Sequence, residues 1–292
     1  MIQTSGFFGP MAPLPDAEAS GLECLHESAS GPCLLLKGHR NDRIVVYKVL
    51  KAGFRDDPVY QRMLRREYEI GVSLKHPGIC ETLAWRELPG YGDGIELEWI
   101  DGCRLDEWLA SHPGDSAQCR QILADLCDAL AYLHHKQVIH KDLKPENILI
   151  TRLGGYVKII DFGLSDTDSI LTGKDPGGTR GYAAPEVLSG KPALAVSDIY
   201  SLGRIMQQMG PAFSRIARKC TATDITCRYA SAEEVRRDLL ALRLSRRHTW
   251  IVSAALLVLL ALGVGYFLHR GDPVRDLFLD AVEQVRQAAT PT

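Results

Sequence analysis

Acidic, basic and amide side chains recur at short spacings between His140 and Asp161. Asp142 could accept a proton from a hydroxyl group, and Lys144, two residues later, could neutralise charge on a transferring phosphoryl group. Asn147 and Asp161 offer the oxygen ligands that Mg²⁺ prefers. Residues of these types, in this order, predict the transfer of a phosphoryl group to a hydroxyl.

Composition restricts the class of protein that could carry this chemistry. The chain has 292 residues, of which 46% are hydrophobic and 24% charged, so it can bury a full core. A net charge of -2 gives no bulk attraction to nucleic acid, and we expect no nucleic-acid partner. The eight cysteines are scattered without a zinc-like spacing, which fits reduced thiols in a cytoplasm.

Residues 22–100 have the pattern of a mainly β region, preceded by an expected flexible tail at 1–21. A hairpin is predicted from strands at 33–37 and 43–50 around a polar turn at 38–42. One helix is expected at 60–74, because apolar residues recur there at helical spacing among charges.

Residues 101–245 have a helical pattern instead. Apolar stripes predict helices at 119–134 and 196–209. Between them, strands at 148–151 and 157–160 flank a Gly-Gly turn. This small hairpin would place the segment 140–147 and Asp161 on either side of itself.

The motifs HKDLKPEN (140–147), DFG (161–163) and GTRGYAAPE (178–186) give the chain a family resemblance. From about Leu22 to Leu242 it resembles the eukaryotic-like (Hanks-type) serine/threonine protein kinases, and its further arrangement resembles the bacterial membrane-anchored type. The resemblance implies an α+β, two-lobed protein-kinase fold, with a β-rich N-lobe at 22–100 and a helical C-lobe at 101–245. It also implies ATP and Mg²⁺ as cofactors and protein substrates with Ser/Thr hydroxyls.

In such kinases a strand lysine contacts the α- and β-phosphates of ATP, and Lys48 in VVYKVL matches it. The glutamate that pairs with this lysine matches Glu67, ten residues before Pro77. Glu69 is the alternative partner.

The resemblance assigns the catalytic loop as follows. Asp142 would be the catalytic base, and Lys144 would stabilise charge on the γ-phosphoryl group. Asn147 and Asp161 would hold two Mg²⁺ ions. Thr179 would touch both Asp142 and Lys144 from the end of the activation segment.

The nucleotide site implied by the resemblance includes backbone partners for adenine at Glu98 and Ile100, beside the gatekeeper position Leu97. The residues expected to line it are Gly31, Cys33, Val46, Lys48, Glu98, Ile100 and Leu149. His26 and Ser28 stand where the family usually has glycine, so ATP is expected to bind less tightly.

Other positions also bear on the family pattern. Lys141 replaces an arginine, which puts phosphate-gated activation in doubt, although residues 161–186 offer phosphoacceptors. Gly71 replaces a bulky apolar residue.

The stretch after Met209 is too short for a full αG region. Glu186 and Arg228 are expected to form a buried ion pair, and Asp198 to anchor the catalytic loop.

Residues 250–268 carry no charge and would span about 28 Å as a helix, close to a bilayer's hydrocarbon core. Arginines crowd the N-terminal flank, which predicts a single transmembrane helix with the kinase cytoplasmic at the inner membrane and 269–292 outside. Ala261 and Gly265 would let two such helices approach, leaving open a homodimer that autophosphorylates.

Three functions remain open on the sequence. An active kinase is favoured because the phosphate, base and metal residues are present together. A pseudokinase that only docks partners is the rival, motivated by the glycine-poor loop, Lys141 and Gly71. A small-molecule phosphotransferase of the aminoglycoside-kinase type is disfavoured by the motif at 178–186.

Overall fold

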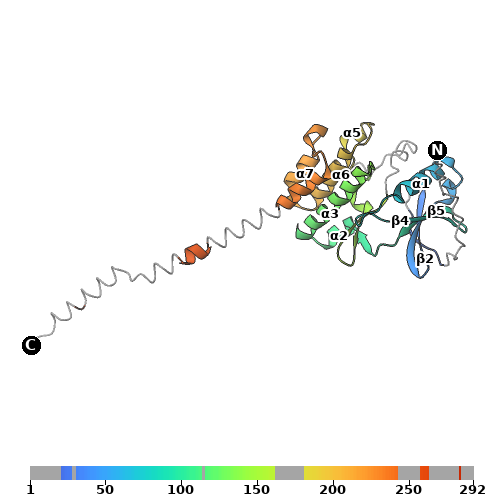
Figure 1. Cartoon of the computed structure of the whole chain (residues 1–292), viewed down its shortest axis with the longest axis horizontal. Coiled ribbons are helices and arrows are strands. Elements are labelled where there is room, and N and C mark those ends of the chain that lie inside the picture. Colours follow the sequence, from blue (N-terminus) through green and yellow to red (C-terminus); the bar gives the residue numbers. More distant parts are fainter. Residues whose placement is uncertain are drawn as a thin grey trace, which may run out of the picture. The chain divides into compact units, whose positions relative to one another are not determined.

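The computed structural model describes residues 21–27, 31–113, 116–161, 181–242, 257–262 and 283. Contacts divide the chain into two units, residues 1–239 and 240–292. The first unit contains a β-rich lobe and a helical lobe, as predicted (Figure 1).

The small lobe is built on a five-stranded antiparallel sheet in the order β1-β2-β3-β5-β4. Its strands are β1 (Glu23–Glu27), β2 (Cys33–Arg40), β3 (Arg43–Leu50), β4 (Thr82–Leu88) and β5 (Gly92–Glu98). The turn between β2 and β3 is shorter than predicted, because β2 continues to Arg40. Asn41 and Asp42 alone form it, with φ of 46° and 61°, the left-handed geometry that tight hairpins require.

Helix α1 (Pro58–Gly71) packs against this sheet. Its start is fixed by Asp57, whose carboxylate accepts a hydrogen bond from the Val59 amide at 2.8 Å, and by a proline at the first helical position. The helix begins before the predicted Tyr60 and ends before the predicted Leu74. Leu64 is 2% exposed and contacts a cluster that includes Leu50 and Ile95.

The large lobe is helical around a fully buried core. Its α-helices are α2 (Leu105–Ser111), α3 (Ser116–His135), α5 (Pro185–Leu188), α6 (Ala195–Gln208) and α7 (Ser214–Cys220), followed by a helical stretch at 232–242. The predicted helices at 119–134 and 196–209 are α3 and α6, with ends shifted by one to three residues. The apolar stripe of α3 is buried as expected, and α6 contacts both α3 and α7.

Single-turn 3₁₀ helices complete the lobes. They are η1 (Ala52–Phe54), η2 (Pro145–Asn147), η4 (Pro211–Phe213) and η5 (Ile225–Cys227). Only residues 209–213 separate α6 from α7, so the connection is as short as the sequence suggested.

A second, three-stranded sheet lies in the order β6-β7-β8. The predicted hairpin is β7 (Ile148–Thr151) and β8 (Val157–Ile159), while β6 (Gly102–Arg104) was missed. A strand of three residues is too short to show alternation, and it forms because β7 is there to pair with it. The Cys80 amide donates a hydrogen bond to the Ile159 carbonyl, and the Ile159 amide donates one to the Gly78 carbonyl, both at 2.8 Å. These bonds join the segment after α1 to β8.

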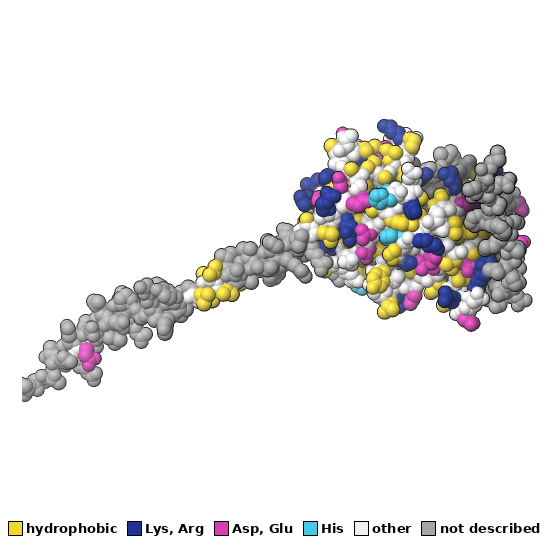
Figure 2. Space-filling model, in the orientation of Figure 1, with side chains coloured by type: hydrophobic (Ala, Val, Ile, Leu, Met, Phe, Trp, Pro, Cys, Tyr) yellow, Lys and Arg dark blue, Asp and Glu magenta, His cyan; other side chains and the backbone are white. Residues whose placement is uncertain are grey.

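Among the described residues, no helix is both long and apolar enough to cross a bilayer. Of the expected span 250–268, the structure describes only 257–262, which are helical. The side chains of this short stretch are apolar and largely exposed, with Leu257 at 66% (Figure 2). The rest of the span, the N-terminal tail to residue 20, and 269–292 apart from residue 283, lie outside the described residues.

Candidate active site

Three charged side chains from distant segments meet in the structure: Lys48 on β3, Glu67 on α1 and Asp161, two residues after β8. The Lys48 Nζ atom lies 2.7 Å from Glu67 Oε1 and 2.7 Å from Asp161 Oδ1. Glu69, the alternative partner, is exposed and lies 3.5 Å from Arg65 instead. The helical period explains the choice, because Glu67 lies on the buried face of α1 and Glu69 does not.

Burial and charge act against one another in this cluster. Burial alone would lower the pKa of Lys48, but the carboxylates of Asp161 and Glu67 outweigh it and raise that pKa well above its usual value. Burial raises the pKa of Glu67 to about 7, although Lys48 opposes the change. Burial would also raise the pKa of Asp161, but Lys48 holds it below its usual range. The lysine therefore stays protonated, and Glu67 is the member that titrates near neutrality.

The catalytic-loop residues form a second cluster. Lys144 Nζ lies 2.6 Å from Asp142 Oδ2, and the Asn147 amide nitrogen donates to the Asp142 carbonyl at 2.8 Å and to Asp142 Oδ2 at 3.1 Å. Asp142 Oδ1 is buried and accepts no hydrogen bond from the described residues. This carboxylate is thus oriented through one oxygen and keeps the other as an acceptor.

Asp198, at the start of α6, fixes the loop backbone. It is fully buried, and its two carboxylate oxygens accept from the amides of His140 and Lys141, both at 2.9 Å. His134 Nε2 lies 2.9 Å from the same carboxylate. Lys141 has a φ of 70° and Asp161 a φ of 62°, both in the left-handed region that is unfavourable for residues other than glycine. Tertiary contacts, to Asp198 at Lys141 and to Lys48 at Asp161, accompany this backbone strain at each end of the catalytic segment.

The nucleotide-site residues gather on one face of the small-lobe sheet. Cross-strand partners share a face, and Lys48 pairs with Ile95 while Val46 pairs with Leu97. Cys33 lies on the same face by alternation along β2, and it is half-buried like Val46.

The other expected nucleotide residues lie just before β2, just after β5 and on β7. Gly31, Ile100 and Leu149 are each half-buried, and residues 28–30 lie outside the description. The Glu98 amide donates to the Glu81 carbonyl at 3.0 Å, and the Glu98 side chain pairs with Lys158 on β8. Sequence reasoning did not find this ion pair, because nothing local to Glu98 indicates Lys158.

Thr179 lies outside the described residues, as does most of the segment 161–186 that offered phosphoacceptors. Its contacts with Asp142 and Lys144 therefore remain a prediction. The description resumes at Gly181, just before α5.

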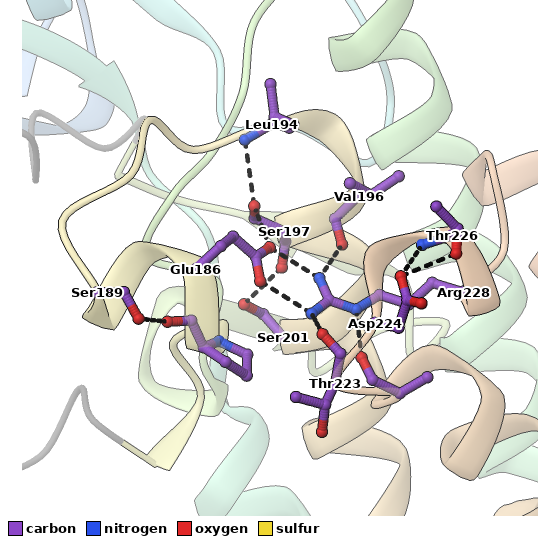
Figure 3. Close-up of polar contacts among 12 residues, drawn as sticks. Glu186, Ser189, Leu194, Val196, Ser197, Ser201, Thr223, Asp224, Thr226 and Arg228 are labelled. Atoms are coloured by element: carbon purple, nitrogen blue, oxygen red, sulfur yellow. Dashed lines mark hydrogen bonds and ion pairs between the residues drawn. The ribbon is translucent and has the colours of Figure 1, made fainter.

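Glu186 and Arg228 form the expected buried ion pair (Figure 3). The Arg228 Nη1 and Nη2 atoms donate to Glu186 Oε1 and Oε2, both at 2.8 Å, and the arginine and glutamate side chains are 0% and 5% exposed. The hydroxyl of Ser197 adds a third bond to the same carboxylate at 2.8 Å. Burial opposes ionisation, yet these donors lower the pKa of Glu186 to about 2. The pair joins α5 to the segment after η5.

Gly71 proves to be the last residue of α1, not an interior helix position. A Cβ atom built on it would lie 2.2 Å from Thr82 Oγ1, so Thr82 of β4 fills the place that a side chain at Gly71 would need. Thr82 is 3% exposed. Sequence reasoning identified the glycine as unusual but missed the threonine, whose position depends on β4 lying beside α1.

Known proteins resemble this chain in sequence. The family model described as "Protein kinase domain" matches residues 24–242. Serine/threonine-protein kinase PknB of Mycobacterium leprae is 33% identical over 183 residues, covering 60% of this chain and 29% of that protein. Serine/threonine-protein kinase PrkC of Bacillus subtilis is 32% identical over 172 residues, covering 58% and 26%. The chain therefore spans less than a third of these relatives.

The fold has solved counterparts. A double mutant of the PknI kinase domain of Mycobacterium tuberculosis superposes with a TM-score of 0.61 at 20% identity, covering 80% of this chain and 100% of that one. A second structure of the same domain gives 0.60 at 21% identity, covering 79% and 100%. Together with the matched family model, the clusters around Lys48 and Asp142 establish that this chain belongs to the protein kinase domain family.

Proposed function

We propose that this chain is an active serine/threonine protein kinase that transfers the γ-phosphoryl group of ATP to protein hydroxyls at a membrane surface. The observation that carries the proposal is the pair of 2.7 Å contacts from Lys48 to Glu67 and Asp161. Lys48 and Glu67 are buried, at 8% and 6% exposed, and a buried charged pair that also meets a third charge from a distant segment points to a use, because desolvating the pair is costly.

In the proposed reaction, the substrate hydroxyl oxygen forms a bond to the γ-phosphorus, and the bond to the leaving ADP oxygen breaks. Asp142 accepts the hydroxyl proton, and its Oδ1 accepts no hydrogen bond from the described residues that would compete for that role. Lys144 stabilises charge on the transferring group, and Lys48 orients the α- and β-phosphates.

The chain's own donor set fits Mg²⁺. The Asn147 nitrogen donates to Asp142, which leaves the amide oxygen as a ligand, and Asp161 supplies a carboxylate. Phosphate oxygens and water would complete the coordination. When bound, Mg²⁺ would neutralise charge on the phosphates. Asn147 and Asp161 would position it.

Membrane anchoring is the second part of the proposal. It is supported by the uncharged run 250–268, by the basic flank before it, and by the exposed apolar side chains of residues 257–262. Through this span the kinase would lie on the cytoplasmic side and two copies would meet to autophosphorylate. The curated relatives match over less than a third of their length, so this proposal stands on the chain's own residues.

The test is ATP-dependent phosphorylation of a generic protein substrate by the full chain in detergent, measured with radiolabelled ATP. Asp142→Asn is expected to reduce turnover by about 10²-fold or more, because it removes the proton acceptor and keeps the shape. Asp93→Asn, at an exposed position near the start of β5, is the matched control and should leave turnover unchanged. Equal, background activity in wild type and Asp142→Asn would instead favour the pseudokinase.

A further inference from the structure

The turn between β7 and β8 exposes two large apolar side chains for which phosphoryl transfer has no use. Leu153 is 89% exposed and Tyr156 is 65% exposed, more than any other large apolar residue described within residues 1–239. Single exposed apolar side chains are common on soluble proteins, but two on one short turn form a small projecting surface.

The direction of the helical stretch 232–242 locates this turn relative to the end of the kinase unit. His135 Nε2 lies 2.9 Å from Glu233 Oε1, and Asp128 Oδ1 lies 2.9 Å from Arg236 Nε. As the chain advances from 233 to 236, its partner on α3 moves back from 135 to 128. The stretch therefore runs antiparallel to α3 and advances toward the N-terminal end of α3.

The exposed turn lies at that same end of α3. A Cβ atom on Gly155 would lie 3.1 Å from Gln118 Nε2, in the first turn of the helix. Along the axis of α3, Gln118 lies ten residues, or about 15 Å, from Asp128. Along the helical stretch 232–242, residue 242 lies six residues, or about 9 Å, beyond Arg236. The helical stretch thus ends within about two turns of the level of Leu153 and Tyr156.

Few residues separate that point from the proposed anchor. Residues 243–249, with the sequence RLSRRHT, can span about 10 Å as a helix and at most about 25 Å extended. Their three arginines would favour an anionic lipid surface by about 1 kcal/mol each. Along the chain, a bilayer holding 250–268 would therefore begin within about 25 Å of residue 242.

We infer that Leu153 and Tyr156 insert into the headgroup region of the bilayer that residues 250–268 enter, so that the turn is a second contact with lipid. The inference rests on the proposed membrane anchoring. Tyrosine favours the interface, where its ring is apolar and its hydroxyl stays hydrated. Arg152 is already paired with Asp101 at 3.1 Å, so the turn adds little charge. The anchor confines the domain near the surface, so even a weak contact becomes populated.

The test uses the full chain in liposomes of phosphatidylcholine and phosphatidylglycerol, with the fluorescent amino acid Anap placed at position 156. Spin-labelled headgroup lipids should quench this probe by about twofold. A probe at Leu188, which is 54% exposed on the short helix α5, is the control and should not be quenched. Leu153→Asp should return the probe at 156 to the control level.

Flotation of the same liposomes separates the two proposals. A chain that fails to float with lipid would refute membrane anchoring. A chain that floats while the probe at 156 is unquenched would refute the lipid contact alone. Quenching that appears only at high protein density would also refute it, since the lipid contact would then depend on crowding by neighbouring copies and not on the anchor of a single chain.

Discussion

The buried pair Glu186–Arg228 gives the sharpest stability prediction. Replacing Arg228 with methionine keeps much of the side-chain volume but leaves a carboxylate that is 5% exposed without its bidentate partner. One-sided loss of a buried ion pair costs about 3 to 5 kcal/mol. The pKa of Glu186, lowered from 4.5 to about 2, corresponds to a similar value of about 3 kcal/mol.

The sign of the pH dependence follows from that lowered pKa. A carboxyl whose pKa is lower in the folded protein contributes its full stabilisation above its unfolded value of 4.5, and loses it as pH falls toward about 2. In Arg228→Met the carboxylate gains by protonation instead. The difference in unfolding free energy between wild type and variant should therefore be largest near neutral pH and shrink below pH 4.5.

The assay is urea unfolding of the full chain in mild detergent, followed by circular dichroism at several pH values from neutral to acidic. Arg236→Met is the matched control, because Arg236 and Asp128 are 40% and 46% exposed and their pair should contribute at most about 1 kcal/mol. A cost for Arg228→Met as small as the control's, or a cost independent of pH, would refute the reasoning.

Two further predictions concern the position of α1. The rate of phosphoryl transfer should fall as pH drops through about 7, because protonation of Glu67 removes a charge that holds Lys48. The Glu67→Gln variant should be slower at every pH, but its pH–rate profile should lack this fall on the acidic side. An unchanged acidic limb in that variant would assign it to another group. Gly71→Ala should destabilise the fold by about 1 to 3 kcal/mol and weaken ATP binding, because the added Cβ atom meets Thr82. Adding Thr82→Ala in the same chain should restore part of the stability and part of the ATP affinity. Thermal melts and ATP titrations check this, with Gly53→Ala, where nothing lies within 4 Å, as control; equal effects at both glycines would exclude the clash.

Much of the site was predictable because its residues lie in short motifs. The contacts among Asp142, Lys144 and Asn147 are all made within five residues, so their spacing nearly fixes their geometry. The choice of Glu67 over Glu69 followed from the family resemblance, and in the structure it is Glu67 that contacts Lys48. By contrast, the strand β6 and the exact ends of α1 depended on neighbours and caps that a local pattern does not reveal.

The sequence alone determined the class of chemistry and the order of the elements, because phosphoryl transfer needs particular side chains, and hydrophobic periodicity reports helices and strands locally. Only the tertiary structure decided which distant groups meet. It joined Lys48 to Asp161 across 113 positions and placed Thr82 against Gly71. It also set the turn at Leu153 beside the start of α3. Such contacts arise from the packing of whole elements, whose relative positions no single segment encodes.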